Sequence, residues 1–557
     1  MKITAKAVSP LEKVFYDDKP AKFKAYGKST ALIGENVAFE TIYFAEEFAE
    51  HCYQTYNCFA KAQLYCGGTE VDASCVTVSA VEHMPAVYAA VMEEAPDDYI
   101  RRMPGMYPDM LVPISEDTPF AVLPRLTGTL WVSIDTENLD SGKYTAVITI
   151  TDENREKAAE VKHEFKIIPA RLPKQTIAVT QWLHTDCIAD YYNIEVFSDE
   201  YWTAVRNNIK TAVRYGTNVV YTPLFTPPLD TNPGAERTTV QLIDVKQTAD
   251  GYSFGFDKLH KWVKMCLECG AEYFEMSHLF TQWGAYHAPK IMAGDKQLFG
   301  WDTDAAGEEY TKFLSQFLPA LCSEIKSLGI ADKTVFHISD EPAFEHLESY
   351  RAASRTMHKY IGDFKVMDAM SHPVFFEEGL VDIPVPHVIH DEKFAGFKPE
   401  PRWIYYCGSE KNCMGRAFGM HSARNRISGT QFYSCNADGF LFWGFNFYNA
   451  ARSVRKIDPF AVTDAGMKFV SGDSFVVYPA PDFKVYNSLR LEVFRHGIDD
   501  MRALQLCESL YSRAEVDAVL AEFNDGNPIA LREIPKDREF TLKMRNKING
   551  MIEKAIK

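Results

Sequence analysis

The sequence predicts a multidomain protein in which an N-terminal antiparallel β-sandwich precedes a (β/α)8 barrel of the TIM type and a helical C-terminal tail. Three observations predict this architecture. The chain has 557 residues, more than one ordinary hydrophobic core accommodates. Residues 1–170 contain short strand-like runs, and residues 171–510 alternate strands with helices. Residues 511–557 read as a helical extension, which we expect to pack on the barrel.

The β-sandwich is predicted from runs rich in β-branched and aromatic residues, separated by Gly, Asp and Asn turn residues. Asp140-Ser141-Gly142 is one such turn signal, and long helical periodicity is scarce. An antiparallel sandwich is the simplest product of this pattern. Residues 168–174, with two prolines, are expected to form the linker to the next domain. The clearest strand-like runs are 38–43, 76–81, 129–134 and 144–150.

The barrel is predicted from eight short apolar runs, most of them followed by a helical stretch. The runs are 177–183, 218–221, 273–276, 335–339, 366–369, 385–388, 403–407 and 439–443. The clearest helical stretches are 200–214, 257–268, 308–327 and 343–361. Two connections, 222–252 and 277–306, are long enough to indicate lids or binding loops. Residues 538–557 form a basic amphipathic helix.

Composition excludes several classes of partner. The formal charge is 59 − 76 = −17, so a nucleic-acid partner is not expected, because phosphate binding requires a basic face. We find no apolar run of signal-peptide or membrane-spanning length, so we expect a cytoplasmic protein without a membrane partner. The 12 cysteines lack a framework spacing. Cys266 and Cys269 form a lone CxxC without further nearby ligands, so neither a metal nor a cofactor is expected.

Asp340 and Glu341 are the strongest candidates for catalytic groups. They follow the predicted strand 335–339 directly, and barrel enzymes place catalytic groups at the C-terminal ends of their strands. Pro342 disfavours helical angles at Glu341 and could let both side chains face one pocket. Glycoside cleavage needs one carboxyl to protonate the leaving oxygen and a negative group to support the oxocarbenium-like centre. The alternative is structural, with Asp340 as the N-cap of a helix.

Short motifs through most of the chain resemble those of glycoside hydrolase family 123. The matching stretches are Tyr107-Pro108-Asp109, Gln181-Trp182-Leu183-His184-Thr185-Asp186, Thr222-Pro223-Leu224-Phe225-Thr226-Pro227-Pro228, Thr281-Gln282-Trp283-Gly284-Ala285, His337-Ile338-Ser339-Asp340-Glu341-Pro342, Trp443-Gly444-Phe445-Asn446-Phe447-Tyr448-Asn449, Gly472-Asp473 and Tyr478-Pro479. The family comprises β-N-acetylgalactosaminidases with an N-terminal β-sandwich and a catalytic barrel. Each motif is modest alone, but their order along the chain is specific.

The resemblance implies a substrate-assisted retaining mechanism. The 2-acetamido oxygen of a terminal β-linked N-acetylgalactosamine attacks the anomeric carbon and forms an oxazolinium intermediate. By this resemblance, Glu341 is the general acid and then the base that activates water, and Asp340 orients the acetamido N–H. The protein then needs one proton-transfer group and one orienting anion. The implied partner is an oligosaccharide or glycoconjugate substrate.

Further candidates for substrate contacts lie near predicted strand ends. Trp283 and Trp443 could stack on a sugar ring, or they could pack in a lid or the barrel. Hydroxyl, amide, imidazole or carboxylate groups could contact the sugar, with a buried structural hydrogen bond as the alternative for the Tyr and Asn side chains. These candidates are His184, Asp186, Glu275, His278, Tyr405, Tyr406, Asn446 and Tyr448. They lack short metal-ligand spacing, so sugar contacts are preferred over a metal site.

Two other functions remain open from sequence. One is a glycosidase with a protein nucleophile, for instance Glu275 opposite Glu341, acting on a sugar without an acetamido group. The other is a carbohydrate-binding protein without activity, against which the intact Asp340-Glu341 pair argues. The oligomeric state, the natural glycan, the aglycone and the configuration at C4 of the sugar stay open.

Overall fold

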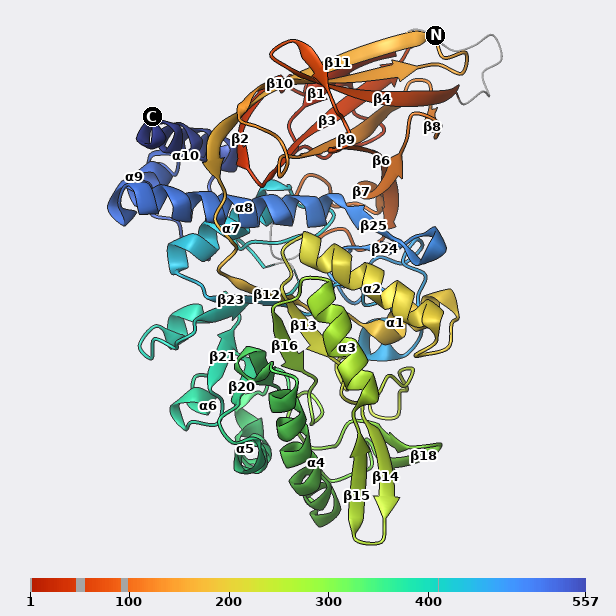
Figure 1. Ribbon diagram of the computed structural model, residues 1–557, viewed down its shortest axis with the longest axis vertical. Helices are drawn as coiled ribbons and strands as arrows, with labels where there is room; N and C mark the ends of the chain where they lie inside the picture. The colour runs from red at the N-terminus through yellow and green to blue at the C-terminus, as the bar shows by residue number, and fades with distance from the viewer. Residues whose placement is uncertain (1–2, 47–55, 92–98, 409) are drawn as a thin grey trace. The chain divides into compact units, whose positions relative to one another are not determined.

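The computed structural model describes residues 3–46, 56–91, 99–408 and 410–557, and these form two compact units (Figure 1). The first unit comprises residues 1–175, 411–435 and 486–557, apart from the residues outside these ranges. The second unit comprises residues 176–410 and 436–485. The chain therefore passes from the first unit to the second and back twice.

Two β-sheets form the main part of the first unit. Their strands are β1 (Ile3–Val8), β2 (Lys28–Ile33), β3 (Asn36–Ala45), β4 (Tyr56–Cys66), β5 (Thr69–Val71), β6 (Val76–Ala86), β7 (Gly105–Ile114), β8 (Phe120–Val122), β9 (Thr127–Asp135), β10 (Gly142–Thr151), β11 (Lys157–Arg171) and β25 (Val485–Ser488). One sheet has the order β1-β3-β9-β6-β7-β25, and the other has the order β2-β11-β10-β4-β5 with β8 beside β4. The four strand-like runs predicted here lie in β3, β6, β9 and β10.

Both sheets contribute to one hydrophobic core, as expected for two sheets packed face to face. Phe39 and Leu130 from the first sheet and Ile148 and Phe165 from the second belong to this core. The second sheet is mixed, because β2 runs parallel to β11, so the prediction of a purely antiparallel domain is wrong at this edge. The strand β11 continues to Arg171, where it still pairs with β2, so half of the predicted linker is strand.

Four α-helices belong to the described residues of the first unit. They are α7 (Ala423–Cys435), α8 (Leu489–Leu510), α9 (Arg513–Glu522) and α10 (Phe540–Ile556), and a 3-10 turn, η1, covers Pro20–Lys22. The helix α10 contacts α7, α8, α9, β2 and β11. Its apolar residues Met544, Ile548 and Ile552 are fully buried. The C-terminal helices thus group with the sheets of the first unit, and the expectation that they pack on the barrel is corrected.

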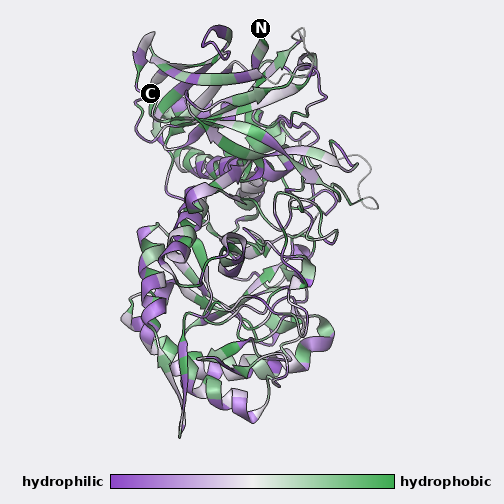
Figure 2. Cartoon of the chain, turned by 90° about the vertical axis from the view of Figure 1, so that its right-hand side faces the viewer, coloured by the Kyte–Doolittle hydropathy of each residue, from purple (hydrophilic) through white to green (hydrophobic). Residues whose placement is uncertain are grey.

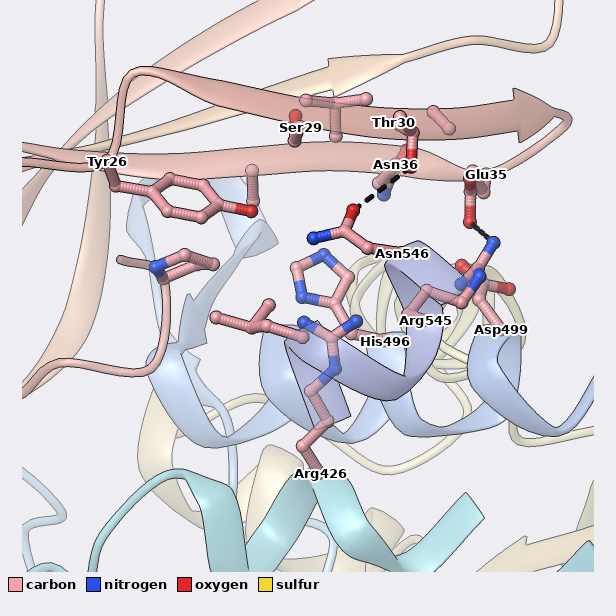
Figure 3. Close-up of a pocket in the computed structure, with 15 residues that line it drawn as sticks. Tyr26, Ser29, Thr30, Glu35, Asn36, Arg426, His496, Asp499, Arg545 and Asn546 are labelled. Carbon is pink, nitrogen blue, oxygen red and sulfur yellow. Dashed lines mark hydrogen bonds and ion pairs between the residues drawn. The ribbon is translucent and has the colours of Figure 1, made fainter. Parts of the chain in front are cut away.

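Buried charges join these helices to each other and to the sheet. Arg426 of α7 donates two hydrogen bonds to Asp500 of α8, at 2.7 and 2.9 Å. Arg545 of α10 donates to Asp500 at 3.0 Å and also pairs with Glu35. Figure 3 shows Arg426, Arg545 and Glu35 around a small cavity of this unit. The opposite charges satisfy one another there, as buried charges require.

The second unit is built around an eight-stranded parallel sheet. Its strands are β12 (Ala178–Gln181), β13 (Val219–Thr222), β16 (Tyr273–Met276), β19 (Thr334–Phe336), β20 (Lys365–Met370), β21 (Ile383–Pro386), β22 (Trp403–Tyr405) and β23 (Gly439–Phe442). The order is β21-β20-β19-β16-β13-β12-β23-β22, and all the described pairings are parallel. Each of the eight predicted strands overlaps one of these. The two end strands, β21 and β22, meet at one parallel bridge between His387 and Tyr405.

Helices connect most of these strands and lie around the sheet (Figure 1). They are α1 (Thr185–Tyr192), α2 (Asp199–Arg214), α3 (Asp257–Glu268), α4 (Glu308–Ser327), α5 (Leu347–Ile361) and α6 (Val374–Glu377), with 3-10 turns η2 (Ala331–Lys333), η3 (Phe344–His346), η4 (Asp391–Phe394), η5 (Ala451–Ser453) and η6 (Pro481–Phe483). In α2, Ser198 caps the N-terminus by accepting from the Tyr201 N–H. Tyr201, Val205 and Ile209 recur every four residues and are buried, so one face of this helix is apolar.

The two long connections contain strands of their own. The pairs are β14 (Asp244–Thr248) with β15 (Gly251–Gly255), and β17 (Ile291–Ala293) with β18 (Lys296–Phe299); a short strand, β24, covers Tyr478–Pro479. Figure 2 shows hydrophilic residues along the outer helices and hydrophobic residues along the inner strands. In the part of the chain that the structure describes, we find no helix of sufficient length and apolarity to cross a membrane.

Candidate active site

Asp340 and Glu341 lie in a short loop between β19 and η3. The backbone of Glu341 has φ +46°, a left-handed conformation that is uncommon for residues other than glycine. Its N–H donates to the Ala369 carbonyl at 3.1 Å, and the Asp340 carbonyl accepts from the Trp283 N–H at 3.0 Å. The helix α5 begins only at Leu347. Asp340 therefore does not cap a helix, and the structural alternative for this pair is wrong.

The two carboxyls differ in their surroundings. Burial and the neighbouring charges of Glu341 and Asp368 raise the pKa of Asp340 well above its ordinary value, while the charge of His337 opposes the rise. Glu341 accepts a hydrogen bond from the Tyr405 hydroxyl at 2.5 Å. Burial and the Glu341 charge raise the pKa of Tyr405, so this phenol keeps its proton and remains a donor. Tyr405 is thus placed beside the predicted acid.

A buried network of charged groups surrounds His337, three residues before Asp340. His337 Nδ1 lies 2.9 Å from Asp368 Oδ1, and His337 Nε2 lies 2.7 Å from Glu275 Oε1. Burial alone lowers the pKa of His337, but the hydrogen bonds and charges of Asp368 and Glu275 outweigh it and raise the pKa to about 9. All three side chains are fully buried. Glu275, a predicted substrate ligand, is therefore enclosed in this network instead of lying on an accessible surface.

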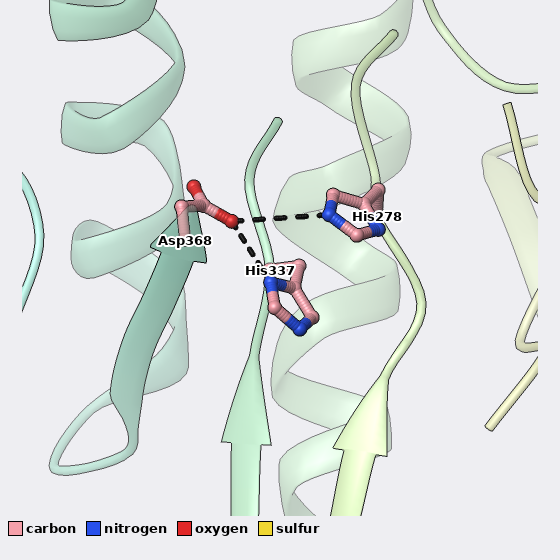
Figure 4. Close-up of side chains that lie close together, drawn as sticks. All are labelled: His278, His337 and Asp368. Atoms are coloured by element: carbon pink, nitrogen blue, oxygen red, sulfur yellow. Dashed lines mark hydrogen bonds and ion pairs between the residues drawn. The ribbon is translucent and has the colours of Figure 1, made fainter. Parts of the chain in front are cut away.

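His278 adjoins the network on one face of His337 (Figure 4). The two imidazole rings stack with centroids 4.2 Å apart, and His278 Nδ1 lies 2.9 Å from the Tyr221 hydroxyl. Burial and the His337 charge hold the pKa of His278 well below its ordinary value, so this ring is neutral. Among the described residues, the group close enough to share a metal ion is His278, His337 and Asp368. Like Glu275, His278 is buried and faces the network.

Trp283 is the predicted aromatic contact with the most exposed ring. Trp283 is 38% exposed and has φ +58°. Its backbone N–H donates a hydrogen bond to the Asp340 carbonyl. The guanidinium of Arg452 lies over its ring, 5.6 Å from the centroid. Asp230 accepts from the Arg452 N–H at 2.8 Å. A partly exposed indole in a segment bonded to the Asp340 backbone is a suitable surface for the C–H face of a sugar.

Trp443 and Tyr406 occupy more enclosed positions. Trp443 donates from Nε1 to Asp473 Oδ2 at 3.1 Å and contacts the rings of Phe447 and Phe469. Asp473 also accepts from the Gly408 N–H at 3.0 Å. Tyr406 is buried, with its ring against Phe440 and Phe442. Packing accounts for the contacts of both rings.

The remaining predicted residues form a second polar cluster of the same unit. Arg237 donates to Asp186 at 2.8 and 2.7 Å and lies 3.1 Å from His184 Nδ1. Asn446 accepts from the His184 N–H and donates to the His184 carbonyl. Tyr448 donates to the Val477 carbonyl at 3.0 Å. All of these side chains are buried, so the cluster shapes the loops after β12 and β23.

The charges of this cluster compensate one another. Burial and the Arg237 charge lower the pKa of His184 to about 3, so the imidazole is neutral. Burial by itself raises the pKa of Asp186, but Arg237 outweighs it and holds the pKa below its ordinary value. Arg237 is not among the residues that the sequence predicted for the site. It lies in a Pro-rich connection, where an arginine reads as exposed.

His337 and Asp368 are the main functional candidates that sequence reasoning missed. Both lie in or beside predicted buried strands, 335–339 and 366–369. An ionisable residue in a buried strand needs a partner. That signal was available, but the identity of the partner depends on the order of strands in the sheet.

Comparison with known proteins gives a family. No curated protein sequence matches the chain. One similar solved structure is a family 123 glycoside hydrolase from Clostridium perfringens, described in terms of glycolipid glycan hydrolysis, with 16% identity and a TM-score of 0.75, covering 100% of this chain and 99% of that one. A β-galactosidase from Bacillus circulans sp. alkalophilus has 10% identity and a TM-score of 0.36, covering 59% and 56%. The family model of the glycoside hydrolase 123 catalytic domain matches residues 182–507, more than half of the chain. The chain therefore belongs to glycoside hydrolase family 123 and is a glycosidase.

Proposed function

We propose that the enzyme releases terminal β-linked N-acetylgalactosamine from a glycoconjugate by substrate-assisted catalysis with retention. The observation that carries this proposal is the pair of adjacent carboxyls in the loop after β19: Glu341 accepts a hydrogen bond from Tyr405, and burial and neighbouring charges raise the pKa of Asp340. The proposed frame is a (β/α)8 barrel completed by the bridge between His387 and Tyr405. The glycolipid glycan named for the Clostridium enzyme motivates a glycoconjugate substrate.

In the proposed first step, the acetamido carbonyl oxygen forms a bond to the anomeric carbon as the bond to the leaving oxygen breaks. Glu341 gives its proton to that oxygen. Asp340, as a carboxylate, accepts a hydrogen bond from the acetamido N–H and balances the charge of the oxazolinium ion. In the second step, Glu341 takes a proton from water, which attacks the anomeric carbon and reopens the ring.

A protein nucleophile at Glu275 is less well supported. Its Oε2 accepts from the Thr180 hydroxyl at 2.5 Å, and its Oε1 accepts from Trp182 Nε1 at 3.0 Å and faces His337. Both oxygens are thus engaged in a buried site. A nucleophile needs an oxygen that can reach the anomeric carbon, whereas the substrate's own acetamido group needs no such residue.

A panel of nitrophenyl β-glycosides tests the proposal. We expect the N-acetylgalactosaminide to be cleaved, with slower cleavage of the N-acetylglucosaminide and none of the galactoside or glucoside. Turnover of sugars without the acetamido group would contradict the substrate-assisted mechanism and favour a protein nucleophile. Preference for the glucosaminide would overturn the sugar assignment alone.

Glu341→Gln tests the acid-base role. We expect kcat on an alkyl β-N-acetylgalactosaminide to fall by about 10²- to 10⁴-fold, and less on a nitrophenyl substrate, whose good leaving group needs little protonation. Glu348→Gln is the matched control, because Glu348 is exposed on α5 and pairs only with Arg351 among the described residues. An unchanged rate for Glu341→Gln would contradict the assignment.

A further inference from the structure

Both ring nitrogens of His337 point at carboxylate oxygens. Nδ1 lies 2.9 Å from Asp368 and Nε2 lies 2.7 Å from Glu275. A neutral imidazole has one N–H, so it would leave a nitrogen lone pair against a carboxylate oxygen. An imidazolium donates to both. With both acids ionised, this geometry therefore calls for an imidazolium, and the ring is completely buried.

The remaining donors of the network hold the backbone that leads to the catalytic pair. Asp368 accepts from the Ile338 and Ser339 N–H groups at 3.2 Å each and from the Tyr350 hydroxyl at 2.6 Å. The Ser339 hydroxyl donates to the Thr281 carbonyl at 2.7 Å. The residues immediately before Asp340 are thus tied to the loop that carries Trp283 and to β20.

We infer that His337 is a positioning residue for the glycosidase reaction, a buried imidazolium that bridges Glu275 and Asp368 and thereby fixes the loop carrying Asp340 and Glu341. This inference rests on the proposed roles of that pair. The network draws on β12 through Thr180, on the residue after β12 through Trp182, on β16 through Glu275, and on β20 through Asp368. A loop with a left-handed Glu341 needs such support, because its backbone conformation is not favoured locally.

The charge of His337 opposes the rise in the pKa of Asp340 that burial and the neighbouring carboxyls cause. The titratable groups that face the network are Glu275 from β16, Asp368 from β20, His278 after β16, Tyr221 from β13, Tyr350 from α5, and Asp340 with Glu341 from its own loop. His278 is neutral, and Glu275 and Asp368 together outweigh one cation. Without His337, the charges of Asp368 and Glu341 would act on Asp340 without the opposing charge of His337, which disfavours the ionised form of Asp340.

A bound metal ion is the competing explanation for the same side chains. His278 Nε2 is buried without a hydrogen-bond partner among the described residues, and it lies 4.0 Å from Asp368 Oδ1. A divalent ion would have to displace the proton between His337 and Asp368, whose atoms are already at hydrogen-bond distance. We therefore favour the proton, and the experiment below separates the two.

Nitrogen-15 NMR of the full chain with labelled histidine tests the protonation state without reference to activity. We expect one histidine, assigned as His337 by its loss in His337→Gln, to show the shifts of a doubly protonated ring from pH 6 to pH 8. The signals must be unchanged after dialysis against a chelator, and elemental analysis must find no stoichiometric metal. A neutral ring, or shifts and metal content that a chelator removes, would overturn the inference.

Kinetics of paired variants test the positioning role. We expect His337→Gln to lower kcat by about 100-fold with a small change in KM, because a displaced catalytic pair loses turnover. In the double variant with Glu275→Gln, the two amides can bond to each other and to Asp368, and one carboxylate charge is removed with the cation. We expect the double variant to recover at least tenfold of that loss.

A control variant and two contradicting results complete this test. His358→Asn removes a half-buried histidine of α5 that pairs with Asp382, and the variant is expected to retain the wild-type rate. Equal or additive losses in the double variant would overturn the positioning role. If instead the glycoside panel shows a protein nucleophile while the NMR result stands, the proposed function fails and the imidazolium bridge does not.

Discussion

At the scale of single residues, the site combines an uncommon backbone conformation with unequal carboxyl environments. Glu341 has a positive φ, and so do Trp283 and Arg452. Strained residues persist only where the surrounding structure holds them, and they cluster at functional sites. In this enzyme the backbone N–H of Glu341 donates to the Ala369 carbonyl, and the backbone N–H of Trp283 donates to the Asp340 carbonyl. These contacts hold a loop in which the two adjacent carboxyls interact, since the charge of Glu341 helps to raise the pKa of Asp340; a regular strand would direct the two side chains to opposite faces.

Asp340→Asn separates activity from stability. Because the pKa of Asp340 is raised in the folded protein, there is a pH window, between the ordinary pKa and the raised one, in which the folded protein holds this proton and the unfolded chain has lost it. The free energy of unfolding therefore falls as pH rises through that window and stays lower above it. Asparagine has no such titration. We expect the variant to lose about 100-fold or more of kcat but to melt at a higher Tm than wild type at pH 7.

The Tm difference between Asp340→Asn and wild type should shrink as the pH falls toward the ordinary pKa of 3.8 and vanish below it, where the wild-type carboxyl is protonated in both states. Thermal scans at several pH values, with kcat on the N-acetylgalactosaminide, provide the measurement. A lower Tm for the variant at pH 7 would show that the carboxylate stabilises the fold and would contradict the burial argument.

At the scale of elements, close packing of helices in the first unit depends on two glycines. A Cβ added to Gly429 of α7 would lie 1.7 Å from the Gly497 carbonyl oxygen of α8, and one added to Gly497 would lie 2.7 Å from the Arg426 carbonyl oxygen. Backbone cannot move aside as a flexible side chain can. The glycines thus permit the approach that lets Arg426 reach Asp500.

Gly429→Ala is expected to lower the free energy of unfolding by about 3 kcal/mol or more, since overpacking against backbone costs at least as much as overpacking in a core. Gly550→Ala is the matched substitution, because Gly550 lies in α10 with nothing within 4 Å of an added Cβ. We expect it to raise stability by roughly 0.5–1 kcal/mol. Urea unfolding monitored by circular dichroism provides both values, and equal effects of the two substitutions would refute the close-approach argument.

At the scale of the whole molecule, each of the two units is built from segments that are not continuous in the sequence. The segment 411–435 returns to the first unit between β22 and β23 of the parallel sheet, and the segment 486–557 returns to it after the last strand of that sheet. The last helix, α10, supplies Met544, Ile548 and Ile552 to the interior of that unit and Arg545 to Glu35 and Asp500. The C-terminal helix is therefore part of the β-rich unit.

A chain ending at residue 537 tests this division. We expect faster hydrogen exchange in β2 and β11, whose contacts with α10 are lost, and unchanged exchange in the eight parallel strands of the second unit. Hydrogen exchange with mass spectrometry resolves these segments. Faster exchange in the parallel strands with β2 and β11 unaffected would instead agree with the predicted docking of the tail on the barrel.

The sequence by itself determined the elements and the catalytic candidates. Local periodicity placed all eight strands of the parallel sheet and the helices α2, α3 and α4, because burial patterns depend on residues near one another in the chain. The position of Asp340 and Glu341 after a buried strand also followed from the local pattern. Tyr405 was a candidate for the same reason.

Only the tertiary structure decided which side chains meet. The strand order brings Glu275 and Asp368 to opposite nitrogens of His337, residues separated by 62 and 31 positions. It also encloses Glu275 and His278, which sequence reasoning had assigned to the substrate, and pairs Asp186 with Arg237. An ionisable residue within an apolar strand indicates from sequence that a buried partner is needed. Which residue becomes that partner depends on the order of strands that are distant in the sequence.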